Sequence, residues 1–360
     1  MIANFRWLSG LMLLLALFLT GCSDSSEQSQ TSTSGADADA ETEEQETTTW
    51  RFALEEVEGS VQDAYAQEFK KRIEEQSEGA ISVEIYPYGA LGTSSQLTEL
   101  VQNGALELAF ASPGHLASVI PEVGIFTLHF VLSDDNDINK KILSSDQVHE
   151  ILQPAYHEQN MHLLSIVPEG WMVWSANKPL RTPADFDNFK MRTMTSPILT
   201  AAYEAYGANP TPKPYSEVYS ALQLGEIDGQ VNPIFAIEEM SFYEEQDYLI
   251  QAKHEQFIST FLAGQSWFQG LPQEQQEMIT QVRDEMVDWI YQEQAEYNDE
   301  RLQIIKDAGG TEVITLTNEE RQAFREASQP VREMYLENAG ERGQKLLDYV
   351  TTQVEELTNE

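Results

Sequence analysis

Cysteine is almost absent from this chain of 360 residues: Cys22 stands alone, so an internal disulfide is excluded. Basic residues are also scarce, because 21 Lys and Arg face 60 Asp and Glu, for a formal net charge of −39. Such a negative surface argues against nucleic acid as a partner, since that binding depends on neutralising phosphates. It is typical of a protein that stays dissolved in a salty medium, where ions screen its self-repulsion.

Recognisable catalytic and metal-binding motifs are missing as well. We find no glycine-rich phosphate loop, no G-x-S-x-G turn and no paired cysteines for a metal. His157 and His162 resemble part of a zinc-protease helix, but they are five residues apart and the motif requires four. Asp135, Asp137 and Asn139 match the first ligands of a calcium loop, yet Lys140 occupies the position that needs glycine, so a helix start is the better interpretation. These absences disfavour the common hydrolase, kinase and dehydrogenase classes.

The N-terminal apolar stretch, Trp7–Leu19, is too short to span a bilayer comfortably. It ends in Leu-Thr-Gly-Cys, which resembles the site cleaved by lipoprotein signal peptidase. We therefore expect residues 1–21 to be a lipoprotein signal peptide and Cys22 to carry a lipid that anchors the protein to a membrane. The alternative is an ordinary signal peptide that contains a cysteine. Residues 22–49 are rich in polar and acidic side chains and are expected to form a disordered acidic tether.

Beyond residue 50, runs typical of strands and helices alternate along the chain, and the length suggests two domains. Strands are predicted at 50–54, 81–86, 106–111, 163–167, 188–194 and 227–231, with helices between them at 61–76, 96–103 and 197–207. This order predicts an α/β architecture with a largely parallel sheet. A run without glycine or proline predicts a helix of roughly 50 Å over 273–308. Residues 318–356 predict further helices, which we expect to cover the second domain.

The segment Asp185–Pro233 carries the candidate site. Its first strand holds Arg192 and its second ends at Asn232, so the two side chains can converge if the strands are neighbours. An arginine offers a planar fork of donors that matches a carboxylate. The alternatives are a surface arginine paired with an acid and an asparagine that only forms a turn. We take a receptor for a small carboxylate as the working hypothesis.

Several segments resemble the substrate-binding proteins of tripartite ATP-independent periplasmic (TRAP) transporters, the dicarboxylate-binding-subunit family. They are FKMRTMTSP at 189–197, YPYGALG at 86–92, SANKPLRTPADF at 175–186 and GANPTPKPYSEVYSALQLGEIDGQVNP at 207–233. The resemblance implies a periplasmic-binding-protein-like fold of two α/β domains, a ligand cleft between them, and a long helix that spans both. The expected domains are 50–170 with 258–297, and 171–257 with 298–360.

The same resemblance implies a periplasmic receptor without catalytic activity or cofactor, whose partners are one small and one large membrane subunit. By matching motifs, Arg192 corresponds to the family's carboxylate-binding arginine and Asn232 to its helper. Tyr215 falls where the family places an aromatic ring against the ligand. Met172 replaces a second basic residue found in many members, which disfavours a tightly held dicarboxylate.

Within the family the chain most resembles the ectoine-binding branch, in LEEVEGSVQDAYAQ at 54–67, PEG-x-M at 168–172 and NPIFAIEE at 232–239. That branch implies Glu56 as the partner of the ligand's protonated ring. It also implies ring-enclosing aromatics at the positions of His115, Tyr215 and Phe257, of which only Phe257 is kept. Trp171 is a further candidate.

Ectoine and another small organic carboxylate stay equally open as ligands. Two other classes remain as alternatives: a secreted two-domain α/β enzyme acting on a small carboxylate, and a structural lipoprotein without a ligand.

Overall fold

The computed structural model describes residues 47–359. The expected signal peptide, the expected lipid site at Cys22 and the tether up to residue 46 lie outside the described residues. The first strand, β1 (Thr48–Ala53), begins inside the range expected for the tether. Within 47–359, no helix is both long and apolar enough to cross a membrane.

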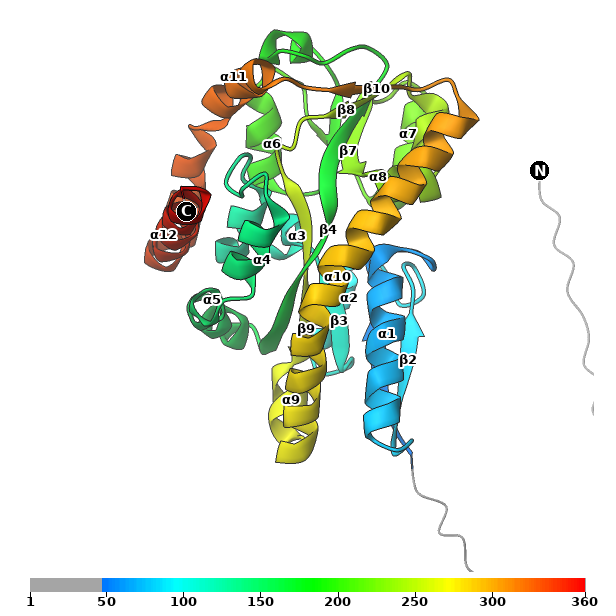
Figure 1. Ribbon diagram of the computed structural model, residues 1–360, viewed down its shortest axis with the longest axis vertical. Helices are drawn as coiled ribbons and strands as arrows, with labels where there is room; N and C mark the ends of the chain where they lie inside the picture. The colour runs from blue at the N-terminus through cyan, green and yellow to red at the C-terminus, as the bar shows by residue number, and fades with distance from the viewer. Residues whose placement is uncertain (1–46, 360) are drawn as a thin grey trace, which may run out of the picture. The chain divides into compact units, whose positions relative to one another are not determined.

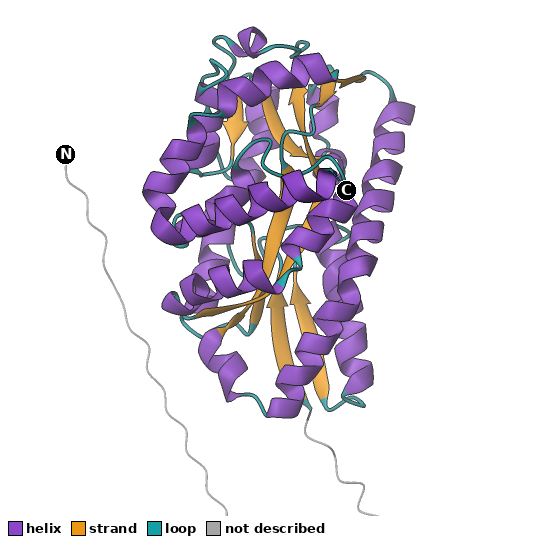
Figure 2. Ribbon diagram, turned by 60° about the vertical axis from the view of Figure 1, so that its left-hand side comes forward, coloured by secondary structure: helices purple, strands orange, loops and turns teal. Residues whose placement is uncertain are grey.

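One group of strands forms the first half of a continuous sheet (Figure 2). β1 pairs in parallel with β2 (Ile81–Tyr86) and with β3 (Leu108–Ala111). β3 then pairs antiparallel with β9 (Gln256–Gly264), which pairs antiparallel with β4 (Met161–Ala176). Helices α1 (Val61–Gln76) and α2 (Ser94–Gln102) make the connections, and the predicted bounds of α1 and β2 are confirmed.

β4 continues into the second half of the sheet and is nine residues longer than predicted at its C-terminal end. Its second part pairs antiparallel with β7 (Gly229–Pro233) and with β8 (Tyr248–Gln251). β7 is parallel to β5 (Met191–Thr193), β5 is parallel to β6 (Thr211–Pro212), and β8 is parallel to β10 (Glu312–Thr315). The expectation that the strands carrying Arg192 and Asn232 are neighbours is confirmed.

The remaining short helices lie between these strands and on both sides of the sheet (Figure 2). They are α3 (Pro113–Leu116), η1 (Pro121–Thr127), α4 (Asn136–Leu143), α5 (Asp146–Glu158), η2 (Pro183–Phe186), α6 (Pro197–Glu204), η3 (Tyr215–Glu217), α7 (Val218–Gln223), α8 (Ile234–Glu239), η4 (Phe242–Glu245) and α9 (Gln265–Gly270). The suspected calcium segment is a helix start, because the Asp135 side chain accepts the Asp137 N–H at 2.8 Å and caps α4. In the same way Ser196 caps α6.

The predicted long helix is confirmed as α10 (Gln273–Ala308), which passes along α1, β4 and α8 (Figure 1). The helices after it only partly match the expectation. α11 (Asn318–Ser328) packs on η2, within the second half, but α12 (Val331–Thr358) packs mainly on η1 and α4, with smaller contacts to α5 and α6. The C-terminal helix therefore returns to the first half, while the expected domain boundaries stay a prediction.

Gly170 marks the place where β4 passes from one half of the sheet to the other. Its φ is +139°, and the β4–β9 register shifts between Pro168 and Gly170. Asn298 of α10 fills the space: its Nδ2 donates to the Glu169 carbonyl at 2.8 Å, and its Oδ1 accepts the Phe235 N–H at 3.2 Å. A Cβ at position 170 would lie 2.6 Å from Asn298 Nδ2. The long helix thus holds β4 and the start of α8 at this crossing.

We expect Gly170→Ala to lower the free energy of unfolding by about 1–3 kcal/mol, because alanine at this φ is strained and also displaces Asn298. Urea denaturation of the purified protein measures the change. Gly270→Ala is the matched control, since a Cβ there meets nothing within 4 Å. Equal stability of the two variants would show that the crossing does not depend on Gly170.

Candidate ligand-binding site

A small cavity opens where β1, β3 and β5 end, as expected for ligands bound beyond the carboxyl ends of strands. It brings together side chains that lie more than 200 residues apart in the sequence. The predicted site residues in its lining are Glu56, His115, Arg192, Tyr215, Asn232 and Phe257. Glu55, Ser94, Ser112, Met194 and Ala236 complete the lining.

Trp171 and Met172 do not line this cavity. They border a separate groove beside α10, where Lys253 lies over the Trp171 ring at 5.5 Å from its centre. Met172 is fully buried in the core with Trp174 and Val231. The register explains this, because Val173 lies opposite Asn232 in the β4–β7 pair and Met172 therefore points to the other face of the sheet.

Arg192 is buried, with an exposed fraction of 1%. Its Nε and Nη2 donate to the Lys213 carbonyl at 3.0 and 2.7 Å, which orients the guanidinium. Among residues 47–359, no carboxylate forms an ion pair with it, and its Nη1 has no hydrogen-bond partner. Burial lowers the pKa of Arg192 to about 10, so the group is still a cation at neutral pH. A buried cation of this kind calls for an anion that the described chain does not supply.

A chain of polar side chains fixes the orientation of Asn232. Its Nδ2 donates to Gln230 Oε1, Gln230 Nε2 donates to Ser175 Oγ at 2.9 Å, and Ser175 Oγ donates to Gln246 Oε1 at 2.9 Å. All four residues are buried. Asn232 therefore presents a held amide beside Arg192, with its oxygen turned away from the Gln230 contact.

The opposite end of the cavity is acidic. Burial raises the pKa of Glu55 to about 7, although the Ser112 N–H donates to its Oε2 at 2.6 Å. Burial, and then the negative charge of Glu169 behind it, raises the pKa of Glu56 well above its ordinary value. Glu169, on β4, was not among the predicted site residues. The signal that could have found it is a lone acid within a strand whose other residues are almost all apolar.

The walls between the two ends are aromatic and uncharged. Burial, with a smaller contribution from Arg192, lowers the pKa of His115 to about 4, so its ring is neutral at pH 7. Burial raises the pKa of Tyr215, which therefore keeps its phenol proton, and its ring meets that of Tyr88 edge-on at 5.9 Å. Phe257 is nearly buried. The arrangement can hold a small molecule with a carboxylate at one end and a positive group at the other.

A second buried cluster joins His129, His254 and Glu255, whose potential metal-ligating atoms lie within 4.8 Å of one another. Hydrogen bonds tie the cluster to neighbouring core residues. The Trp174 Nε1–H lies 3.0 Å from both Tyr203 Oη and His254 Nε2, and Tyr203 Oη lies 3.3 Å from the same His254 nitrogen. We interpret the cluster as part of the buried core.

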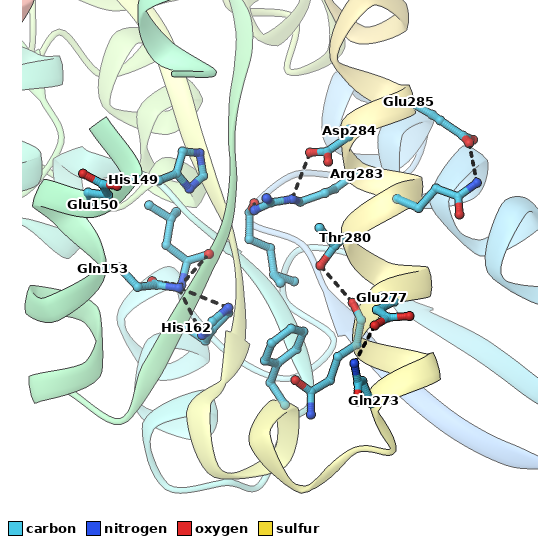
Figure 3. A pocket seen from close by; sticks show the side chains of 15 residues that line it. His149, Glu150, Gln153, His162, Gln273, Glu277, Thr280, Arg283, Asp284 and Glu285 are labelled. Carbon is cyan, nitrogen blue, oxygen red and sulfur yellow. Dashed lines mark hydrogen bonds and ion pairs between the residues drawn. The ribbon is translucent and has the colours of Figure 1, made fainter. Parts of the chain in front are cut away.

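A wider and more open groove lies between α5, β4 and α10 (Figure 3). Arg283, the arginine of this groove, donates hydrogen bonds to the Leu164 carbonyl and, at 3.1 Å, to Asp284. α5 ends at Glu158, so His162 lies on β4 and does not share a helix with His157 as a zinc-protease motif requires. The groove therefore lacks the free cation that marks the smaller cavity.

The profile of the bacterial extracellular solute-binding protein family 7, DctP, matches residues 52–338. The chain belongs to this family, whose members are the substrate-binding proteins of TRAP transporters. The expected two-domain, periplasmic-binding-protein-like fold with a long helix is confirmed. The protein is an extracytoplasmic, periplasmic receptor that works with membrane subunits, and the enzyme alternative is unsupported.

Individual relatives agree with this assignment. The ectoine-binding periplasmic protein TeaA of Halomonas elongata is 39% identical over 86% of this chain and 91% of its own length. The ectoine/5-hydroxyectoine-binding protein UehA of Ruegeria pomeroyi is 36% identical over 83% and 88%. An apo, open crystal structure of a TRAP periplasmic solute-binding protein from Marinobacter aquaeolei VT8 superposes with a TM-score of 0.81 at 47% identity, covering 84% of this chain and all of that one.

If Arg192 is held for a ligand rather than for stability, removing its charge should cost the unliganded protein little. Arg192→Met loses two hydrogen bonds but relieves a buried charge without a counter-ion. Arg321→Met, the matched control, breaks a pair in which Nη1 donates to Asp134 Oδ2 at 2.6 Å and Nε to the Ala252 carbonyl at 2.8 Å. We expect the control to lose about 1–3 kcal/mol of unfolding free energy and Arg192→Met to lose less. A larger loss in Arg192→Met would indicate a structural arginine.

Proposed function

We propose that the receptor captures ectoine or a similar small carboxylate with a positively charged group, and delivers it to the small and large TRAP membrane subunits. The observation that carries the proposal is Arg192, a buried cation without an anionic partner among the described residues, facing the acidic end at Glu55 and Glu56. The names of the two ectoine-binding relatives support the choice of ligand.

Each lining residue then has a role that follows from its chemistry. Arg192 Nη1 donates to the ligand's carboxylate, and Asn232 assists it. Glu56 accepts from the cationic group. His115, Tyr215 and Phe257 enclose the body of the ligand between the two charged ends.

The space between these side chains is about 30 Å³. Sites that enclose a small ligand typically have at least ~300 Å³. Entry of ectoine therefore requires the two walls of the cavity to separate. The expected domain boundaries at residues 170 and 257 fit this motion, because β4 shifts register beside Gly170 and pairs there with Phe257 of β9.

Arg192→Ala should abolish ligand-dependent thermal stabilisation, because it removes the only cation that lines the described cavity. In the parent protein, ectoine at a hundred times its Kd should add about 2.7 kcal/mol of stability. Differential scanning fluorimetry with ectoines, four-carbon dicarboxylates, hydroxy and keto acids, and sugar acids measures the effect. Arg51→Ala is the control, since Arg51 pairs with Glu107 at 2.6 Å outside the cavity. Unchanged stabilisation in Arg192→Ala would refute the assignment.

We also propose that Cys22 is lipidated and tethers the receptor to a membrane, which rests on the signal-like residues 1–21 and the Leu-Thr-Gly-Cys sequence. Cys22→Ala should move the protein from the membrane pellet to the soluble fraction after cell disruption, or leave it unprocessed. A processed variant that stays membrane-bound would contradict lipidation.

A further inference from the structure

Two buried carboxyl groups, those of Glu56 and Glu169, are held by the same residue, Gln62, at the acidic end of the cavity. Two negative charges side by side in a buried place are disfavoured, and burial raises the pKa of both groups, so one of them holds a proton. Gln62 of α1 fixes the pair from one side. Its backbone N–H donates to Glu56 Oε2 at 3.4 Å, and its Nε2 donates to Glu169 Oε1 at 3.1 Å.

The pair has no basic partner. Across the part of the chain that the structure describes, no lysine or arginine forms an ion pair with either carboxyl group, and Glu169 Oε2 is buried without a hydrogen-bond partner. Arg301, on α10, forms an ion pair with Glu238 at 3.3 Å. The titratable and charged groups that face the pair are Glu55 beside β1, Arg192 on β5, Tyr215 on η3, Glu239 on α8, and Tyr297 with Arg301 on α10. A proton on one of the two acids therefore takes the place of a basic partner.

We propose that Glu169 is a positioning residue for ligand selection: it makes Glu56 share a proton in the unliganded receptor, and the ligand's cationic group takes the place of that proton. The inference rests on the proposed function. On binding, the proton leaves to solvent and an N–H of the ligand donates to Glu56 instead. A ligand with a second carboxylate at this end gains no such exchange, so the pair selects for a positive group.

The stability of the unliganded protein should report the pair. Burial and the neighbouring charge raise the pKa of Glu56, and burial raises that of Glu169. A carboxyl group whose pKa is raised by folding contributes stability at low pH that is lost as pH rises through the folded-state pKa. Removing one of the two acids should therefore raise the stability of the unliganded protein most at alkaline pH.

Glu169→Gln tests the inference, because glutamine keeps the size of the side chain and can donate to Glu56 without a titratable proton. Without ligand, we expect its melting temperature to match the parent near pH 5 and to exceed it increasingly towards pH 9. With ectoine, calorimetry in buffers of different ionisation enthalpy should show up to one proton released by the parent. The affinity of the parent for ectoine should then rise up to tenfold per pH unit. The variant should release close to no protons. Glu239→Gln, which alters a nearby acid bonded to Tyr297, should keep the release.

The outcomes separate the two proposals. A variant whose melting temperature is lower at every pH, or which releases as many protons as the parent, overturns the role of Glu169. Failure of the parent to bind ectoine refutes the proposed ligand, while the melting profiles without ligand still decide whether the pair shares a proton.

Discussion

The central constraint on this structure is Arg192, a buried positive charge without an anionic partner among residues 47–359. Desolvating a guanidinium is costly, and proteins normally offset the cost with a carboxylate, as Arg321 does with Asp134. Arg192 instead donates two hydrogen bonds to the Lys213 carbonyl oxygen. Its third nitrogen, Nη1, has no partner, and the residue lines the cavity. The chain has 60 acidic residues, yet none of those described forms an ion pair with Arg192, which is informative. Under the proposed function, the missing anion is the ligand's carboxylate.

The frame around that charge lets the binding surfaces come from distant parts of the chain. β4 runs through both halves of the sheet, β9 pairs with its first part, and α10 packs along β4. The acidic end of the cavity follows β1, whereas Arg192 and Asn232 stand on β5 and β7. The two charged ends therefore belong to different halves, and under the proposed function a ligand that joins them would hold the two halves together.

Part of this could be predicted from sequence because it is local. The bounds of α1, β2 and α10 follow from periodicity and from glycine and proline, and parallel β5 and β7 follow from the strand–helix–strand order. Packing between distant parts of the chain could be predicted less well from the sequence. The register shift between Pro168 and Gly170 breaks the alternation of β4, so counting residues could not show that Glu169 meets Glu56 or that Met172 turns into the core. No local feature of the sequence predicts that α12 packs on the first half either.

A crystal structure of the receptor with ectoine tests the central claim most directly. The account predicts a carboxylate oxygen of ectoine within hydrogen-bond distance of Arg192 Nη1, about 2.7–3.2 Å, with the ring N–H groups directed at Glu56. Ectoine in the reverse orientation, or seated in the groove of Figure 3 with Arg192 unliganded, would contradict it.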